Sequence, residues 1–382
     1  MPSRARAPVA AGRTDFDIAI VGGGSAGCAA ALALSRYTKR RVVLIERSAY
    51  SGTRVGESVS GAIAPLLAYL GIEQLLSERQ HLPAFANIAA WGAPNLVSRE
   101  FLFSAGGHGW LLDRAAFDAD LAAAVERAGI RVLRNTEIAR STRASGVWEI
   151  QLKGRHSPNI AARQIIDATG RRCAIARASG ARRQSFDDLV GLVTWLAFAR
   201  QREQTRAVLV ETVENGWWYS APIPGHRLVL AYMTDAAELD RGLIGNANAL
   251  LRFASGAPLT FARVSDGKPV SPPRVWLAMS AMTAPCVGEG WIAAGDAAAS
   301  FDPLSSLGIG YAMTSGIQAA RALDRRLNGD EEFAAGYAPD VSRHMAAYLD
   351  QRRRLYRYEQ RWPDRPFWSR QHDLRLGARA AA

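Results

Sequence analysis

A glycine-rich turn between two short apolar segments constrains the fold of this chain more than any other feature. Residues 15–47, DFDIAIVGGGSAGCAAALALSRYTKRRVVLIER, predict a buried strand, the pattern Gly22-x-Gly24-x-x-Gly27, a helix and a second strand. Gly22 permits a tight turn, Gly24 lets a pyrophosphate approach the backbone, and Gly27 lets the helix pack closely on the strand. The order of these elements is typical of a dinucleotide-binding α/β domain.

The residues around this turn are candidate contacts to the dinucleotide. The helix is predicted from Ser25 to about Tyr37, so Ser25 and Ala26 present free amides to the phosphates. Glu46 ends the second strand about 20 residues after the glycines, where a carboxylate can bind a ribose. Further candidate contacts are Arg47, Ser58 and Ile138.

A second glycine-aspartate pair indicates which dinucleotide is bound. EGWIAAGDAAASFDPLSSLGIG predicts a strand that runs into Gly295 and Asp296, then a loop, then a long helix from near Ser306. A carboxylate at this strand end can bind the ribityl hydroxyls of a flavin, and amides near Gly308 and Ile309 would face its pyrimidine edge. The predicted cofactor is FAD. The alternative is a helix-capping aspartate in a glycine-rich turn.

Two more segments are predicted to reach the same cofactor. Arg114 begins an amphipathic helix and could contact the FAD phosphates or ribityl chain; the alternative is a surface charge near the helix start. The strand of ARQIIDATGRR ends at Asp167, and a chain returning to the cofactor sheet would place this turn beneath the pyrophosphate.

These motifs together resemble a known group of flavoproteins. Over about residues 15–345, the chain resembles aromatic monooxygenases and flavin-dependent halogenases of the hydroxybenzoate-hydroxylase fold. The motifs that carry the resemblance are, in this order, VGGGSAG, VGES, DR..FD, DATGR and GDAAASFDPLSSLGI. GWWYSAPIP followed by HRLVLAYMTD resembles the halogenase subgroup, and within it the LodB-type and GoxB-type maturases, which act on peptidyl tryptophan in building tryptophylquinone cofactors. The resemblance implies a Rossmann-type FAD-binding domain with an inserted mixed β-sheet domain.

Two departures from the halogenase pattern disfavour halogenation. Halogenases carry a lysine after the GES segment, where this chain has Ala86 and Asn87, and no lysine occurs between positions 40 and 152. Arginine is no substitute because it stays protonated. Tryptophan halogenases also place a glutamate where this chain has Ser305.

The remaining chemistry predicts a monooxygenase. Reduced FAD and dioxygen form a hydroperoxide at the flavin C4a carbon, which can hydroxylate an electron-rich ring, and the protein must exclude water and hold that ring. The aromatic stretch Glu214–Pro224 would supply a rigid wall, with Trp217 facing the cavity; alternatively, Trp217 and Trp218 both brace the seam between domains. The candidate active-site residues are Trp217, Glu57, Pro303 and Ser305.

Other roles for these groups stay open. Glu57 can be a buried structural acid, and His81 and His108 are weaker acid-base candidates. The predicted substrate is tryptophan or an indole, free or within a peptide, and the reductant is NAD(P)H or a separate flavin reductase. The alternative functions are a halogenase with a displaced lysine, a flavin oxidase, and a maturation partner that binds a target protein without catalysis.

The motifs divide the chain into four predicted parts. Residues 15–183 and 283–345 form a discontinuous FAD-binding domain, and residues 184–282 form the inserted substrate domain. Residues 1–14 are predicted to be a flexible basic arm. Residues 346–382 form a C-terminal helical, basic tail, whose Arg352–Arg354 cluster is either the solvated face of a packed helix or a docking surface for an acidic partner.

Composition excludes several classes of protein. The net charge is +12, but the arginines are scattered and no aromatic-basic motif accompanies them, so nucleic acid is not a predicted partner. No apolar run approaches the length of a membrane span, and the N-terminal apolar stretch is too short for a signal peptide. The spacing of the cysteines, Cys28, Cys173 and Cys286, matches no metal site and no disulfide pattern. We therefore expect a reduced, cytoplasmic protein without a metal.

Overall fold

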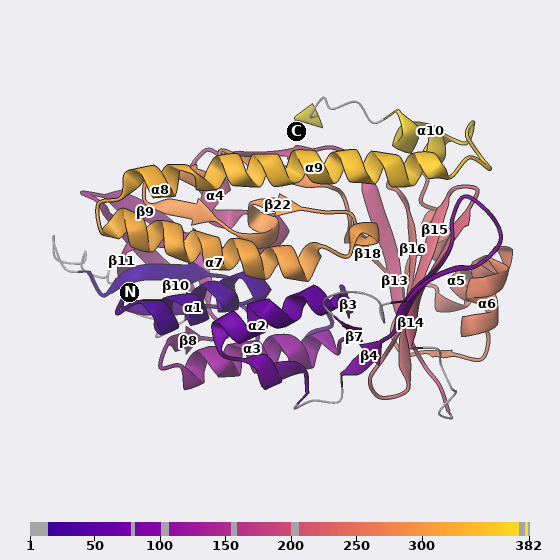
Figure 1. Cartoon of the computed structure of the whole chain (residues 1–382), viewed down its shortest axis with the longest axis horizontal. Helices are drawn as coiled ribbons and strands as arrows, with labels where there is room; N and C mark the ends of the chain where they lie inside the picture. Colours follow the sequence, from indigo (N-terminus) through magenta and orange to yellow (C-terminus); the bar gives the residue numbers. More distant parts are fainter. Residues whose placement is uncertain are drawn as a thin grey trace, which may run out of the picture.

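Two β-sheets organise the chain, and one long helix runs along both of them (Figure 1). The computed structural model describes residues 14–77, 81–100, 107–153, 159–199, 206–373 and 379–380. All of the predicted basic arm except Thr14 lies outside the described residues. In the described part of the chain, no helix combines the length and apolarity needed to cross a bilayer.

The first sheet has a parallel centre. Its strands follow the order β21-β11-β1-β2-β8, and antiparallel strands flank them. Because parallel strands end at one edge, this order brings the glycine turn, Glu46 and Gly295 to the same edge, where ligands bind in open α/β sheets. The strands are β1 (Phe16–Val21), β2 (Val42–Ile45), β8 (Arg131–Leu133), β9 (Glu137–Ala144), β10 (Val147–Lys153), β11 (Ile160–Asp167), β20 (Val287–Gly288) and β21 (Trp291–Ala293).

Helices cover this sheet, and two of them cross at very close range. Residues 25–34 of α1 are all buried, and α7 packs directly against this helix. A Cβ atom on Gly316 of α7 would lie 2.2 Å from the carbonyl oxygen of Ala26, so glycine is required at the crossing. The helices of this half are α1 (Ser25–Tyr37), α2 (Ala64–Leu70), α3 (Arg114–Arg127), α4 (Ala174–Ala178), α7 (Gly308–Leu327) and α8 (Glu331–Ala335).

The second sheet is mostly antiparallel and extends beyond the predicted insertion. Strands β5 and β6 come from residues before 184, and β5 pairs in parallel with β14. The predicted limits of 184–282 therefore leave out part of this sheet. Its strands are β5 (Ala86–Ala90), β6 (Val97–Glu100), β13 (Leu189–Ala197), β14 (Ala207–Val213), β15 (Gly216–Ile223), β16 (Arg227–Asp235), β17 (Lys268–Pro269) and β18 (Arg274–Leu277).

Two faces of the second sheet pack against different partners. Trp218 and Tyr232 pack with residues of α5 (Ala247–Phe253) on one face, next to α6 (Pro258–Val264). The opposite face carries Trp217 and packs against the C-terminal helices. The predicted α/β fold with an added mixed sheet is thereby confirmed.

Small strand groups join the two halves. After its earlier passage through β5 and β6, the chain crosses to the second sheet again after β12 and returns before β19. These groups are β22-β19-β12-β23 and β3-β7-β4, comprising β3 (Ser58–Val59), β4 (Leu82–Ala84), β7 (Gly109–Leu111), β12 (Arg182–Ser185), β19 (Ala281–Ala284), β22 (Ala299–Ser300) and β23 (Arg379–Ala380).

Helix α9 (Tyr337–Tyr358) spans both halves along the upper edge of the view, and α10 (Pro366–His372) follows it over the second sheet (Figure 1). The predicted boundary between residues 345 and 346 falls inside α9. The helix does not stop there because its buried stripe continues on both sides of that point, through Met345, Tyr348 and Leu349.

Candidate functional site

The glycine turn after β1 leaves an open space above the start of α1. Gly22 has φ +106°, and a Cβ atom there would lie 2.1 Å from the carbonyl oxygen of Ala168. A Cβ on Gly27 would lie 1.8 Å from the Gly22 oxygen, whereas one on Gly24 would meet no atom within 4 Å. The outer glycines thus serve packing, and the middle glycine leaves room for a ligand.

The start of α1 has the polarity that an anion requires. Its N-terminal amides receive no side-chain cap, and the buried hydroxyl of Ser25 has no hydrogen-bond partner within the described residues. Ala26 is also buried at this point. Unpaired donors at a helix N-terminus form a site for phosphate.

Glu46 fixes the turn from the neighbouring strand. Its carboxylate accepts a hydrogen bond from the Gly23 amide at 2.7 Å and from the Ser48 amide at 2.9 Å. Arg54 lies 3.6 Å from the same carboxylate and donates to Asp118 at 2.9 Å. The sequence analysis missed Arg54, which follows no motif. The neighbouring candidate Arg47 is exposed.

Asp167 supports the turn from below through contacts within the chain. One carboxylate oxygen accepts from the amide and hydroxyl of Thr169, and the other accepts from the amides of Ile175 and Ala176, each at 2.9 Å. The carboxylate is fully buried. Its hydrogen bonds hold the Ala168 turn against Gly22 and cap α4.

The second glycine-aspartate pair meets the first helix in space. Gly295 and Asp296 lie in a 3₁₀ turn, and a Cβ on Gly295 would approach the Ala26 Cβ within 2.8 Å. The Asp296 carboxylate is 37% exposed and lies 3.4 Å from Arg171. An exposed acid therefore stands beside the start of α1, although it is far away in the sequence.

The loop before α7, residues 302–307, is held by its own polar groups, and we call it the 302–307 loop. Asp302 accepts from the Leu304 amide at 2.8 Å, and the Ser305 hydroxyl donates to the Asp302 carbonyl at 2.7 Å. Pro303 and Gly308 are exposed, while Ile309 is buried. Helix α7 begins at Gly308 without a side-chain cap, so its first amides are available to a ligand.

A buried acid lies in the segment that leads into β3. Glu57 is 3% exposed; its Oε2 accepts from the Gly56 amide at 3.0 Å, and its Oε1 has no partner among the described residues. Burial raises the Glu57 pKa to about 7, which Arg114 partly opposes. The guanidinium of Arg114 donates to the Val55 and Gly56 carbonyls, so it fixes this segment. Ser58 continues it as the first residue of β3.

Comparison with known proteins shows the family to which this chain belongs. Residues 17–187 match the family of FAD dependent oxidoreductases. Over 365 residues the chain is 31% identical to LodB of Marinomonas mediterranea, whose name describes it as an FAD-dependent oxidoreductase; the match covers 94% of this chain and 97% of LodB. The chain belongs to the LodB family of FAD-dependent oxidoreductases. It is an enzyme family whose cofactor is FAD.

Solved structures show the same fold as this LodB-family chain. The myxobacterial chondrochloren halogenase CndH superposes with a TM-score of 0.86 at 22% identity, covering 94% of this chain and 86% of CndH. The peptidyl tryptophan dihydroxylase QhpG superposes with a TM-score of 0.77 at 24% identity, covering 94% of this chain and 79% of QhpG. In sequence, the tryptophan 2-halogenase of Chondromyces crocatus is 24% identical over 83% of this chain and 63% of its own length.

The residues present in this LodB-family site fit FAD. A phosphate would give the Ser25 hydroxyl a hydrogen-bond partner and would fill the open side of Gly24. An electron-rich ring edge would accept hydrogen bonds from the uncapped amides at the start of α7. Ile138, another candidate contact, is half-buried against the core of the same domain.

We expect Asp296→Ala to weaken FAD binding about 10- to 100-fold, because a charged hydrogen-bond acceptor is removed from the cofactor site. The melting temperature of the FAD-free protein should stay close to that of the wild type, since the carboxylate is partly exposed. Flavin fluorescence titration measures the first quantity and circular dichroism the second. Asp340→Ala, at an exposed position of α9, is the control. Unchanged FAD affinity in Asp296→Ala would remove Asp296 from the site.

The structure corrects the position expected for Trp217. Its indole is fully buried, donates from Nε1 to the Tyr356 hydroxyl at 3.1 Å, and packs beside Trp91, so it lines no open cavity in this structure. The reason is that α9 and α10 cover this part of the sheet. Tyr219, two residues further along the same face of β15, is half-buried; burial raises its pKa, and the negative charge of the Glu57 carboxylate adds to that rise. The alternation of side chains along a strand is the signal that could have pointed to Tyr219.

The two histidine candidates differ in their surroundings. His81 is buried, its Nδ1 lies 3.3 Å from the Asp113 amide, and its ring meets the edge of Phe117. His108 is exposed and lies against Trp110. The positions of Ala86 and Asn87, where halogenases carry a lysine, belong to β5 in the second sheet.

Proposed function

We propose that this protein is an FAD-dependent monooxygenase that hydroxylates an electron-rich aromatic ring, the indole of tryptophan within a polypeptide. The observation that carries the proposal is that the glycine turn, Glu46 and Gly295 meet at one edge of the first sheet, while Ala86 and Asn87 stand on β5, where the halogenase lysine would be expected. The name of QhpG, a peptidyl tryptophan dihydroxylase, supports the choice of substrate. The likeness in sequence to the tryptophan 2-halogenase of Chondromyces crocatus supports an aromatic substrate in general.

The proposed reaction balances with two electrons from outside. An aromatic C–H group, dioxygen, two electrons and two protons give a phenolic C–OH group and water. The electrons come from NAD(P)H or from a separate flavin reductase. When bound, reduced FAD supplies the oxygen activation.

The chain's own residues would hold the cofactor in defined places. In this proposal Gly22, Gly24 and the amides at Ser25, Ala26 and Gly27 hold the pyrophosphate, and Glu46 binds the ribose. Asp296 binds the ribityl chain. The amides at Gly308 and Ile309 stabilise negative charge at the pyrimidine edge.

Glu57 is the proposed proton carrier of the site. A carboxyl group with a pKa near 7 can hold a proton at neutral pH and release it, which suits acid-base work. The free Oε1 gives it an unused hydrogen-bonding position. Tyr219 is the aromatic residue of β15 that we place beside it.

The test is turnover of a tryptophan-containing peptide by the FAD-loaded protein. The protein is reduced by a flavin reductase with NADH and given isotopically labelled dioxygen, in buffer with and without bromide. We expect mass spectrometry to detect the peptide with one or more labelled oxygen atoms, and the same product with bromide present. Gly24→Val, which we expect to lose the flavin, is the control.

Other products would overturn this proposal. A brominated peptide would identify a halogenase that works without the lysine on β5. Hydrogen peroxide as the only product, with every indole tried, would identify an oxidase. Tight binding of a target polypeptide with no turnover would identify a maturation partner without catalysis.

A further inference from the structure

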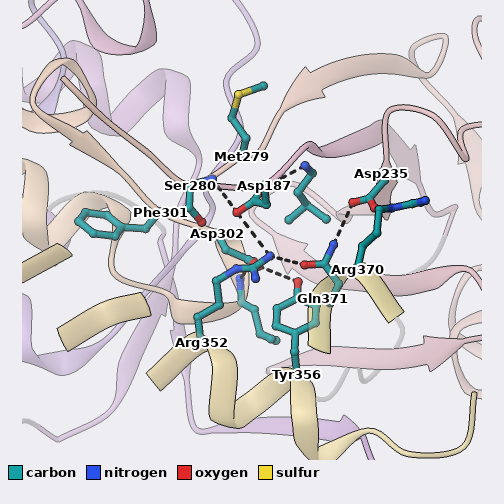
Figure 2. Close-up of polar contacts among 12 residues, drawn as sticks. Asp187, Asp235, Met279, Ser280, Phe301, Asp302, Arg352, Tyr356, Arg370 and Gln371 are labelled. Carbon is teal, nitrogen blue, oxygen red and sulfur yellow. Dashed lines mark hydrogen bonds and ion pairs between the residues drawn. The ribbon is translucent and has the colours of Figure 1, made fainter. Parts of the chain in front are cut away.

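A buried polar cluster joins α9 and α10 to the 302–307 loop and to the second sheet (Figure 2). Its members are Asp187, Asp302, Arg352, Tyr356 and Gln371, and we call it the Arg352 cluster. Asp302 begins the 302–307 loop, and Asp187 lies where the chain crosses between the sheets. The cluster lies outside the residues assigned to FAD above.

Arg352 is the centre of the cluster. Its Nε donates to Asp302 at 3.2 Å, its Nη2 donates to Gln371 at 2.7 Å, and Asp187 lies 3.4 Å from Nη2. The side chain is only 2% exposed. A buried arginine is unavailable to an acidic partner, so the predicted docking surface cannot include Arg352. Removing one member of such an ion pair would leave the other charge buried without compensation, so the cluster is expected to stay intact in the folded protein.

Tyr356 continues the cluster into the second sheet. Its hydroxyl accepts a hydrogen bond from Trp217 Nε1 at 3.1 Å and donates one to Asp302 Oδ2 at 2.6 Å. The other oxygen of Asp302 accepts from the Leu304 amide. A continuous chain of hydrogen bonds therefore leads from β15 to the backbone of the 302–307 loop.

Asp187 ties the start of β13 and the segment before β19 to the same centre. It accepts from the Leu189 amide at 3.1 Å at the start of β13, and from the Ser280 amide at 3.1 Å just before β19. Gln371 donates to Asp235 at the end of β16 at 2.9 Å. The position of the second sheet is thus coupled, through buried polar contacts, to the 302–307 loop.

We propose that Tyr356 is a positioning residue that sets the 302–307 loop against the flavin by way of Asp302, and that Trp217 acts through it. This inference rests on the assignment of the start of α7 to the flavin ring, and it holds whichever substrate the enzyme uses. It gives the aromatic stretch of β15 a structural role at the flavin site, because Trp217 orients the loop through Tyr356.

The test is Tyr356→Phe in the full-length FAD-loaded protein. The ring and its packing stay, and the hydroxyl that bridges Trp217 and Asp302 is lost. We expect the visible circular dichroism of the bound flavin to change, and the FAD dissociation constant to rise about three- to tenfold. Tyr232→Phe is the matched control, because this equally buried tyrosine donates to the Asn215 carbonyl on the opposite face of the sheet and should leave both flavin measurements at wild-type values.

A second pair of variants keeps the test independent of the folding of Tyr356→Phe. Trp217→Phe removes the donor to Tyr356 and should shift the flavin signal in the same direction, whereas Trp218→Phe faces α5 and should not. If Tyr356→Phe and Trp217→Phe lower the free energy of unfolding while the flavin signal matches that of their controls, the role is merely structural and the proposal is wrong. These measurements need no substrate, so failure to hydroxylate an indole would overturn the proposed function alone.

Discussion

Gly27→Ala will cost the folded protein about 3 kcal/mol or more, because its Cβ would lie 1.8 Å from the Gly22 carbonyl oxygen and the backbone must move to make room. The displaced atoms belong to the turn that holds the phosphates, so FAD binding should be lost as well. Urea denaturation of the FAD-free protein measures the first effect, and flavin fluorescence titration measures the second.

Gly24→Val separates ligand binding from folding. Among the described residues, apart from the chain neighbours of Gly24, no atom lies within 4 Å of the added Cβ, so the free energy of unfolding without FAD should stay within about 0.5 kcal/mol of wild type. FAD affinity should fall at least about tenfold, because the side chain fills the space left for the pyrophosphate. Gly256→Val, also without a neighbour within 4 Å but in the second half of the molecule, should leave affinity unchanged. Equal losses of stability in Gly24→Val and Gly27→Ala would contradict this division of roles.

Glu57→Gln will be more stable than the wild type at high pH. Burial raises the Glu57 pKa from 4.5 to about 7, so the folded protein binds the proton more tightly than the unfolded chain does. The wild type therefore loses stability as the pH rises from about 4.5 to about 7, by about 3 kcal/mol in total. Glutamine resembles the protonated acid and avoids this loss.

The measurement is the free energy of unfolding of both proteins, without FAD, at pH 5 and pH 8. The advantage of Glu57→Gln should be small at pH 5 and reach about 2–3 kcal/mol at pH 8. Glu332→Gln, at an exposed position of α8, is the control and should track the wild type at both values. Parallel curves for Glu57→Gln and wild type would show that Glu57 is ionised in the folded protein at neutral pH.

The flavin half of the fold could be predicted because its determinants are local. Gly27 is required by its contact with Gly22, five residues earlier, so the spacing in the sequence reports it directly. The position of Glu46, directly after β2, follows from the length of an apolar run. The second half was harder, since β5 joins it in parallel from a distant part of the chain.

The environment of β15 could not be predicted from its own sequence. Alternation along the strand separates Trp217 from Trp218, but which face the C-terminal helices cover depends on where α9 runs. The burial of Arg352 could not be predicted from its immediate neighbours either, because the sequence presents it as one of three consecutive arginines. Its place in the buried stripe of α9, four residues after Tyr348 and four before Tyr356, is the signal that distinguishes it.

The crossing of α1 by α7 bears on how a newly made chain acquires its flavin. While the ribosome is still translating the second sheet, the hydrophobic side of α1 that Gly316 later covers has no native cover, and Asp296 does not yet exist. We expect the chain to capture FAD only after α7 has been made, so chains truncated before residue 308 should stay colourless when FAD is added.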